Sequence, residues 1–343
     1  MGIGWLRVLC LGALGASLAA NDYTAEIANG GLRARQETHV VMRSERLLIS
    51  QTKIRVEYEF LNESPAPVET VVAFPWPGYA WSAGAATYSP EMWEFLVEVD
   101  GVRVAHQTEI RARVRDRDVT ALLAGMGLHI PSFGHFDDPV QSGKETVPAQ
   151  LAALSPAALE KLKKVGALNR NGLPKWMTFL THYWSQRFPP GRVVRVVHEY
   201  TPMPGGSAYG DLAMIQRPKT EGTAWRSLVD RDFDAREPGC PDEAFSRSYL
   251  ARRRALLEEA PELTSTGLGF SWVRYILTTA NTWKGPIRDF ELIVERNPDE
   301  LVTFCWDGPV EKVGADRFRA ARKDFRPGKE LTVYFVRSLK RQQ

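Results

Sequence analysis

Alternation of charged and apolar residues in the first half of the chain predicts β-strands. Residues 53–60 read Lys-Ile-Arg-Val-Glu-Tyr-Glu-Phe, so every second side chain is apolar. Because successive side chains of a strand point to opposite faces, this segment should have one buried and one solvated face, which is typical of an antiparallel sheet. Apolar or alternating stretches at 68–74, 93–99 and 192–200 predict further strands.

An Asp-Gly pair marks a hairpin after the third of these segments. Asp100-Gly101 is flanked by alternating apolar residues, and such a pair readily adopts the positive φ angles of a two-residue turn. Strand-like patterns return near the end of the chain, at 290–294, 301–304 and 331–336. The pattern as a whole predicts a mainly β protein with antiparallel, β-sandwich-like sheets.

The periodicity becomes helical in two places. Residues 116–128 could form one short helix, and Ser155-Pro156 begins a second, as an N-cap followed by proline at the first helical position. We therefore expect a helical insertion at about 112–180 within the β domain. A further helix is predicted after Pro241, where acidic residues precede apolar residues at helical spacing.

Length and composition are consistent with two folded regions. The 343 residues are 44% hydrophobic and 25% charged, which excludes a disordered chain and a coiled coil. We expect an N-terminal β domain over 21–238, containing the helical insertion, and a C-terminal β region with a leading helix over 239–343. The formal net charge of +3 gives no indication of nucleic-acid binding.

Residues 1–20 have the layout of a secretory signal peptide. One positive charge precedes an apolar run from Val8 to Ala16 that is too short to span a bilayer, and small residues follow. We prefer cleavage after Ala19, with Ser17 at the −3 position, to cleavage after Ala20, which places the larger Leu18 there. No later apolar run is long enough to span a membrane, so a periplasmic or secreted location is expected.

Two cysteines would remain after cleavage. Cys10 lies in the leader, and Cys240 and Cys305 would enter an oxidising compartment. We expect these two to form a disulfide bond; the alternative is a pair of buried thiols.

Short motifs occur in order from residue 21 to residue 327. They include Asn21-Asp22-Tyr23, Gly30-Gly31-Leu32, Phe60-x-Asn62-x-Ser64, Ala73-Phe74-Pro75-x-Pro77, His198-x-Tyr200-x-Pro202, Trp283-x-Gly285-Pro286-Ile287 and Asp324-Phe325-x-Pro327. In these motifs the chain resembles the domain of unknown function 4424 family, whose members are exported bacterial proteins without an assigned activity. The resemblance implies an exported, mainly β protein and supplies no catalytic residue or cofactor.

Standard enzyme signatures are absent from the sequence. His198-Glu199 begins like the zinc-protease motif but lacks its second histidine, and there is no phosphate loop, dinucleotide fingerprint or Cys-x-x-Cys motif. We therefore assign no catalytic residue, no cofactor and no metal ligand. His182 and His198 fall among aromatic residues in strand-like segments and are interpreted as structural histidines.

Two polar clusters could still bind a metal ion. Asp230, Asp232 and Asp234 have the opening spacing of a calcium loop, although the glycine and glutamate that an EF-hand needs further on are missing; solvated carboxylates are the simpler interpretation. A second cluster could serve as a zinc or acid–base site, although its members are close only in sequence. It consists of His129, His135, Asp137 and Asp138.

Five aromatic residues provide the best binding candidate. Aromatic side chains on a loop can stack on sugar rings or anchor a protein partner, and alternatively they can cover one end of the β domain as core. The residues are Trp76, Tyr79, Trp81, Tyr88 and Trp93.

The sequence thus predicts an exported cell-envelope protein of unknown molecular function that acts as a non-catalytic binding or structural module. Its expected partner is an envelope protein or a glycan, and not a nucleic acid. The alternative is a periplasmic hydrolase with an unrecognised acidic or histidine site, with or without a metal. A convergent cleft containing perturbed carboxylates or histidines would favour that alternative.

Overall fold

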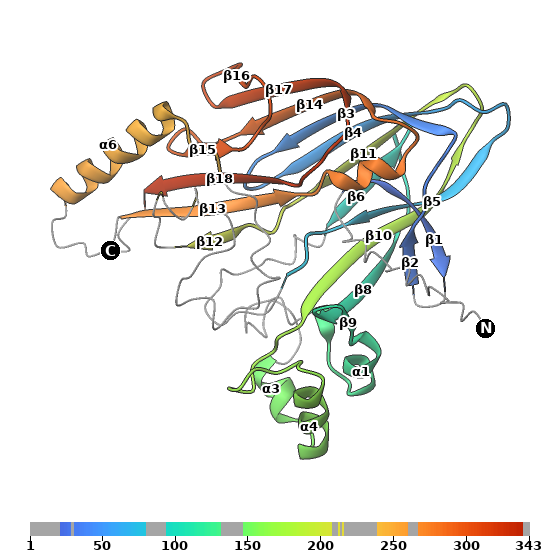
Figure 1. Cartoon of the computed structure of the whole chain (residues 1–343), viewed down its shortest axis with the longest axis vertical. Coiled ribbons are helices and arrows are strands. Elements are labelled where there is room, and N and C mark those ends of the chain that lie inside the picture. The colour runs from blue at the N-terminus through green and yellow to red at the C-terminus, as the bar shows by residue number, and fades with distance from the viewer. Residues whose placement is uncertain are drawn as a thin grey trace, which may run out of the picture.

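In the computed structural model, the strands of the described residues form three β-sheets (Figure 1). The structure describes residues 21–28, 31–79, 94–131, 147–207, 212, 215, 239–259 and 267–338. The prediction of a mainly β, sandwich-like fold is confirmed.

The eight-stranded sheet has the strand order β16-β17-β14-β3-β4-β11-β6-β7. Its strands are β3 (Val40–Ile49), β4 (Ile54–Asn62), β6 (Phe95–Val99), β7 (Val102–Arg103), β11 (Val193–Tyr200), β14 (Ile287–Glu295), β16 (Glu311–Lys312) and β17 (Arg317–Phe325). Burial alternates along the whole of β4, with Val56 and Tyr58 inward and Glu57 and Glu59 outward, as the alternation in the sequence predicts.

Two smaller sheets form the opposite layer. The six-stranded sheet, in the order β2-β1-β5-β10-β8-β9, contains β1 (Tyr23–Ala28), β2 (Gly31–Ala34), β5 (Val68–Pro75), β8 (Gln107–Val114), β9 (Arg117–Asp118) and β10 (Met177–Phe188). The four-stranded sheet, in the order β12-β13-β18-β15, contains β12 (Gly205–Ser207), β13 (Leu268–Tyr275), β15 (Leu301–Phe304) and β18 (Leu331–Ser338).

One hydrophobic core joins the three sheets. It contains Phe60 of β4, Phe74 of β5, Trp184 of β10 and Val333 of β18, all of them buried. Because the inner face of the eight-stranded sheet packs on both smaller sheets, the molecule is a two-layer sandwich whose second layer is divided between two sheets.

The N-terminal and C-terminal segments share the eight-stranded sheet. Strand β14 pairs with β3 in parallel, from Asp289 opposite Ser44 to Val294 opposite Ile49. The boundary expected near residue 238 therefore does not separate two sheets. The predicted hairpin is present, because Asp100 and Gly101 have φ angles of 50° and 82° between β6 and β7.

The predicted insertion lies between β8 and β10 and contains α1 (Thr120–Gly125), α3 (Val147–Ala152) and α4 (Pro156–Lys164). Ser155 caps α4 as expected, since its Oγ accepts a hydrogen bond from the Ala158 amide at 3.2 Å. The insertion is shorter than 112–180, because both ends of that range continue the paired strands β8 and β10. Its residues Leu123, Leu162 and Trp176 belong to a second, smaller core, which also contains Ala112 and Val114 of β8.

The predicted later helix is α6 (Glu243–Glu259), which packs Phe245 and Tyr249 against the outer face of the four-stranded sheet. Next to it, the structure contains the disulfide expected between Cys240 and Cys305, with their Cα atoms 4.8 Å apart. A short 3₁₀ helix, η4 (Thr278–Thr282), lies between β13 and β14. No helix in the described ranges is both long and apolar enough to cross a membrane.

Candidate functional site: a buried polar cluster and a charged sheet face

A cluster of polar side chains is sealed between the two layers. Its centre is the pair of Asp22 Oδ1 and His198 Nε2, which are 2.8 Å apart, and both side chains are fully buried. The Tyr58 hydroxyl lies 3.0 Å from the Tyr275 hydroxyl, and Trp283 donates its indole N–H to the Asp22 carbonyl at 2.7 Å. The pairing of β4 with β11 places Tyr58 close to His198 inside the sandwich.

Glu45 belongs to the same cluster. Its Oε2 accepts a hydrogen bond from Asn21 Nδ2 at 3.0 Å, and the residue is fully buried. Burial raises the pKa of Glu45 to about 8, with a further contribution from the charge of Asp22 and an opposing one from the Asn21 hydrogen bond. Burial also raises the pKa of Asp22, and the neighbouring His198 opposes that shift.

His182 is held in an aromatic environment beside this cluster. Its ring stacks on Phe95 with the centroids 4.4 Å apart, and Thr108 Oγ1 lies 2.9 Å from its Nδ1. Burial, together with the charges of the nearby His106 and His198, lowers the pKa of His182 to about 3. The structure thus places His182 and His198 in the core, where the sequence expects structural histidines.

The buried cluster does not favour the hydrolase alternative. The side chains of Asp22, Glu45, His182 and His198 are between 0% and 3% exposed, so a substrate has no access to them. Within the described ranges, no group of three or more histidine, cysteine or carboxylate side chains could hold a metal ion.

Two of the five candidate aromatics are core residues, which corrects the expectation of an exposed aromatic loop at their positions. Trp76 is 2% exposed, and its ring lies 5.1 Å from that of Tyr200; Tyr79 is 5% exposed. The reason is that the chain stays on the sheet beyond Pro75, where Tyr79 exchanges main-chain hydrogen bonds with Thr178 of β10. Trp81, Tyr88 and Trp93 lie outside the described residues.

The metal candidates are described only in part. His129 belongs to the insertion, where its main-chain N–H donates to Gln150 Oε1 of α3 at 3.0 Å. Its expected companions His135, Asp137 and Asp138, and the aspartates Asp230, Asp232 and Asp234, lie outside the described residues.

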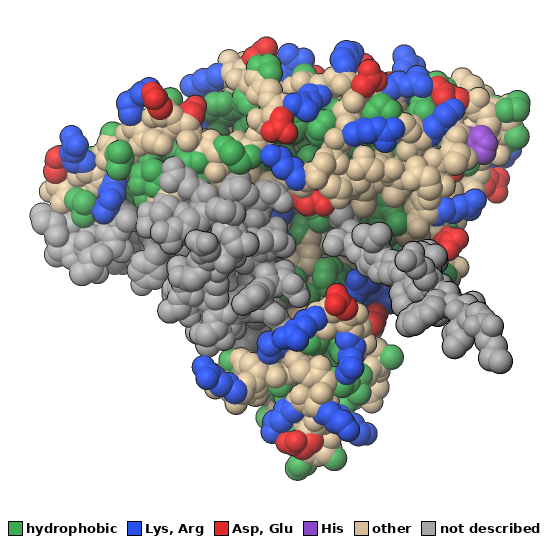
Figure 2. All heavy atoms as spheres, in the orientation of Figure 1, with side chains coloured by type: hydrophobic (Ala, Val, Ile, Leu, Met, Phe, Trp, Pro, Cys, Tyr) green, Lys and Arg blue, Asp and Glu red, His purple; other side chains and the backbone are tan. Residues whose placement is uncertain are grey.

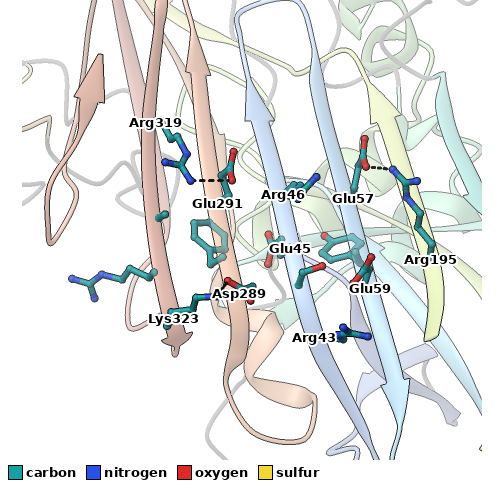
Figure 3. Close-up of a pocket in the computed structure, with 15 residues that line it drawn as sticks. Arg43, Glu45, Arg46, Glu57, Glu59, Arg195, Asp289, Glu291, Arg319 and Lys323 are labelled. Atoms are coloured by element: carbon teal, nitrogen blue, oxygen red, sulfur yellow. Dashed lines mark hydrogen bonds and ion pairs between the residues drawn. The ribbon is translucent and has the colours of Figure 1, made fainter. Parts of the chain in front are cut away.

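The outer face of the eight-stranded sheet is a hollowed surface lined mainly by charged side chains (Figure 3). Acidic and basic residues alternate across its strands: Arg319 on β17, Glu291 on β14, Arg46 on β3, Glu57 on β4 and Arg195 on β11. Strand pairing places Glu291 opposite Arg46 and Arg46 opposite Glu57. We call this surface the charged face.

Ion pairs hold several of these charges in place. Arg319 reaches Glu291 at 3.5 Å, Arg55 reaches Glu57 at 3.1 Å, and Arg195 also binds Glu57. Partial burial of Glu57 opposes a fall in its pKa, but the hydrogen bonds and charges of Arg195 and Arg55 outweigh it and lower that pKa.

Arg43, Arg46 and Glu59 on this surface are available to a partner. Arg43 and Arg46 are exposed and Glu59 is half-buried, and they make no ion pair with any residue in the described part of the chain. The space-filling view shows basic and acidic side chains intermixed over the strands of this layer, along the upper edge of the molecule (Figure 2). The sequence pattern predicts a solvated face for residues 53–60, but the alignment of these charges across several strands follows from strand register, which the pattern does not determine.

Comparison with known proteins identifies the family. The chain belongs to the family described as Domain of unknown function (DUF4424), whose family model matches residues 20–334. No curated protein gives a significant match to the chain.

Distant likenesses are found among solved structures. One is a "putative nutrient binding protein" from Legionella pneumophila subsp. pneumophila str. Philadelphia 1, with 15% identity and a TM-score of 0.43; the match covers 93% of this chain and 70% of that one. Another is the M1 zinc metallopeptidase of Deinococcus radiodurans, with 9% identity and a TM-score of 0.27, covering 88% of this chain and 43% of that one. Likenesses this distant carry no argument about function.

Proposed function

We propose that this protein is a non-catalytic binding module of the cell envelope and that the charged face is its binding surface. The observation that carries the proposal is the fixed lattice of alternating charges across five strands of one sheet, with Arg43, Arg46 and Glu59 left for a partner. The buried pair of Asp22 and His198, together with Glu45 and His182, is by contrast enclosed in the core.

The ion pairs on the charged face are better explained by recognition than by stability. Exposed pairs contribute only about 0–1 kcal/mol each. Fixed charges of both signs, however, steer association and reject partners with the wrong pattern. Because the sheet holds Arg46 between Glu291 and Glu57, a partner would meet a preorganised surface.

The alternation of charge favours a protein partner with a complementary charged surface. Glu57, Glu291 and Asp289 would repel the phosphates of a nucleic acid. A glycan commonly stacks on exposed aromatic rings, whereas the aromatic residues that line this hollow, Tyr58 and Phe290, are 0% and 2% exposed. Of the partners expected from the sequence, an envelope protein therefore fits best.

Export is part of the same proposal. Residues 1–20 have the layout of a signal peptide, and a disulfide such as Cys240–Cys305 is typical of proteins in oxidising compartments. We infer a periplasmic or secreted location.

Charge reversal on this face is the test. The tagged protein and its Arg46→Glu variant would be crosslinked in cells, and the amount of each co-purified envelope protein would be compared. Arg170→Glu is the matched control, because Arg170 is also exposed but lies in the helical insertion. We expect Arg46→Glu to reduce recovery of a specific partner at least about tenfold, since a like charge at a contact costs more than 1.4 kcal/mol. Equal recovery from both variants would refute the assignment of this face.

A further inference from the structure

Asn21 is anchored by hydrogen bonds from both its main chain and its side chain. Its main-chain nitrogen donates to Thr279 Oγ1 at 2.9 Å, and its carbonyl accepts from the same hydroxyl at 2.8 Å. Its side chain accepts from Tyr58 at 2.6 Å and donates to Glu45 at 3.0 Å. The residue is fully buried, so the chain is firmly held within the sandwich from position 21 onward.

Beside this residue, Glu45 lacks a positive partner. In the described part of the chain it makes no ion pair, and its Oε1 has no hydrogen-bond partner. The titratable groups around it are Asp22, Tyr58 and Tyr275, and none of these can supply a positive charge. The nearby basic side chain is His198, and it is paired with Asp22 and not with Glu45. A buried carboxylate without a cation is costly, so either Glu45 takes up a proton or a cation is supplied.

We propose that the leader is removed after Ala20 and that the new α-ammonium group of Asn21 is the buried cation that pairs with Glu45. In the cleavage, water adds across the Ala20–Asn21 peptide bond: the hydroxyl goes to the Ala20 carbonyl carbon and the hydrogen to the Asn21 nitrogen. That amine then takes a proton from solvent. A leader peptidase of the export machinery would catalyse this step.

The number of hydrogen-bond donors at the Asn21 nitrogen explains why we place the cleavage at the Ala20–Asn21 bond. An amide at Asn21 has one hydrogen, which Thr279 already accepts, whereas an ammonium has two more to offer to Glu45 Oε1 and its surroundings. An α-amino group titrates near 7.7–8.0 in the absence of a partner, and a carboxylate beside it would keep it charged to higher pH. Cleavage after Ala19, which the leader sequence favours, would leave an amide at Asn21 and place the charge one residue away.

Processing would then complete the core. The groups that contact Asn21 and Asp22 come from β3, β4 and β11 of the eight-stranded sheet and from η4. Because β1 of the six-stranded sheet begins directly after them at Tyr23, the new terminus would connect both layers of the sandwich. This inference rests on the proposed export but not on the charged face, so the two can fail separately.

N-terminal sequencing and amine labelling test the inference directly. We expect the exported protein to begin at Asn21 and its α-amine to resist acylation at pH 8 until the protein is unfolded. A mature chain that begins at any other residue would overturn the proposal. So would an Asn21 amine that reacts equally fast in the folded and unfolded protein.

A set of variants isolates the pairing with Glu45. One chain would begin at Asn21 and another at a glycine added before it, each made with Glu45 and with Glu45→Gln. We expect the extra glycine to lower the melting temperature of the Glu45 chain by at least about 4 °C, because it removes one partner of a buried ion pair. In the Glu45→Gln chain the extra glycine should lower the melting temperature clearly less.

The matched control is Glu59→Gln, which changes an outward carboxylate on β4. In this variant the extra glycine should lower the melting temperature as much as it does in the chain with both glutamates. If the extra glycine lowers the melting temperature equally with Glu45 and with Glu45→Gln, the loss of stability is steric and the ion pair is refuted. If the extended chain does not fold, the sequencing and labelling results still decide the proposal.

Discussion

Buried titratable residues are the most unusual feature of this protein at the scale of single residues. Asp22, Glu45, His182 and His198 occupy positions in the sandwich where apolar side chains are the rule. Two of them could be anticipated, because His182 and His198 fall in strand-like segments among aromatic residues. Glu45 could not: a β-bulge between Met42 and Ser44 shifts the alternation of β3 and turns Glu45 inward.

His182 should make stability dependent on pH. A histidine in the unfolded chain titrates near 6.5, whereas burial lowers the pKa of His182 to about 3 in the folded protein. Between these values the unfolded state binds more protons, so this contribution to stability is complete above pH 6.5 and is lost as the pH falls towards 3.

The measurement is chemical denaturation from pH 7 to pH 4 on the wild type and on His182→Asn. We expect the variant to be less stable at pH 7 but to lose less stability on acidification. The exposed His39→Asn variant should follow the wild type. Parallel curves for the wild type and His182→Asn would contradict the assignment.

At the scale of elements, the sequence predicts strands well and pairings poorly. Residues 53–60 alternate without an error, and they lie within β4. The ends of the predicted insertion overlap the ends of β8 and β10, because polar residues are half-buried in β8, as at Arg111 and Arg113, and buried in β10, as at Thr178, so neither strand has a clear alternating pattern. The parallel pairing of β3 with β14 joins segments more than 200 residues apart, and local periodicity contains no information about such contacts.

The helical insertion should unfold separately from the sandwich. Leu162 is fully buried in the small core that the insertion forms with Leu123 and Trp176. We expect Leu162→Ala to lower the free energy of unfolding of the insertion by about 2–5 kcal/mol. The insertion should then be cleaved in limited proteolysis while the sandwich remains intact. Leu159→Ala, at a half-buried position of α4, should have a smaller effect. Simultaneous unfolding of the insertion and the sandwich would show that they form one cooperative unit.

The Cys240–Cys305 disulfide should stabilise the region around α6. It closes a loop of 65 residues, for which chain entropy gives a contribution of about 4 kcal/mol. We expect the Cys240→Ser, Cys305→Ser double variant to melt at a lower temperature than the wild type, and reductant to lower the melting temperature of the wild type only. A wild-type melting curve unchanged by full reduction would contradict this.

At the scale of the whole molecule, assembly of the sheet creates the charged face. The outward charges of 53–60 are evident from the sequence, but their alignment with Asp289, Glu291 and Arg319 depends on the register of β3, β14 and β17. The expectation that Trp76 and Tyr79 belong to an exposed aromatic loop is wrong for a related reason: pairing with β10 buries both residues in the core. A surface assembled from distant segments cannot be identified until the pairing is known.

Position-specific photocrosslinking is the most direct test of the binding surface. A photoreactive residue would be placed in turn at positions 43, 46 and 59 on the charged face and at position 170 on the insertion of the exported protein. We expect one envelope protein to be crosslinked from all three positions of the charged face and not from position 170. Crosslinks that are absent from the charged face, or equally strong at position 170, would contradict it.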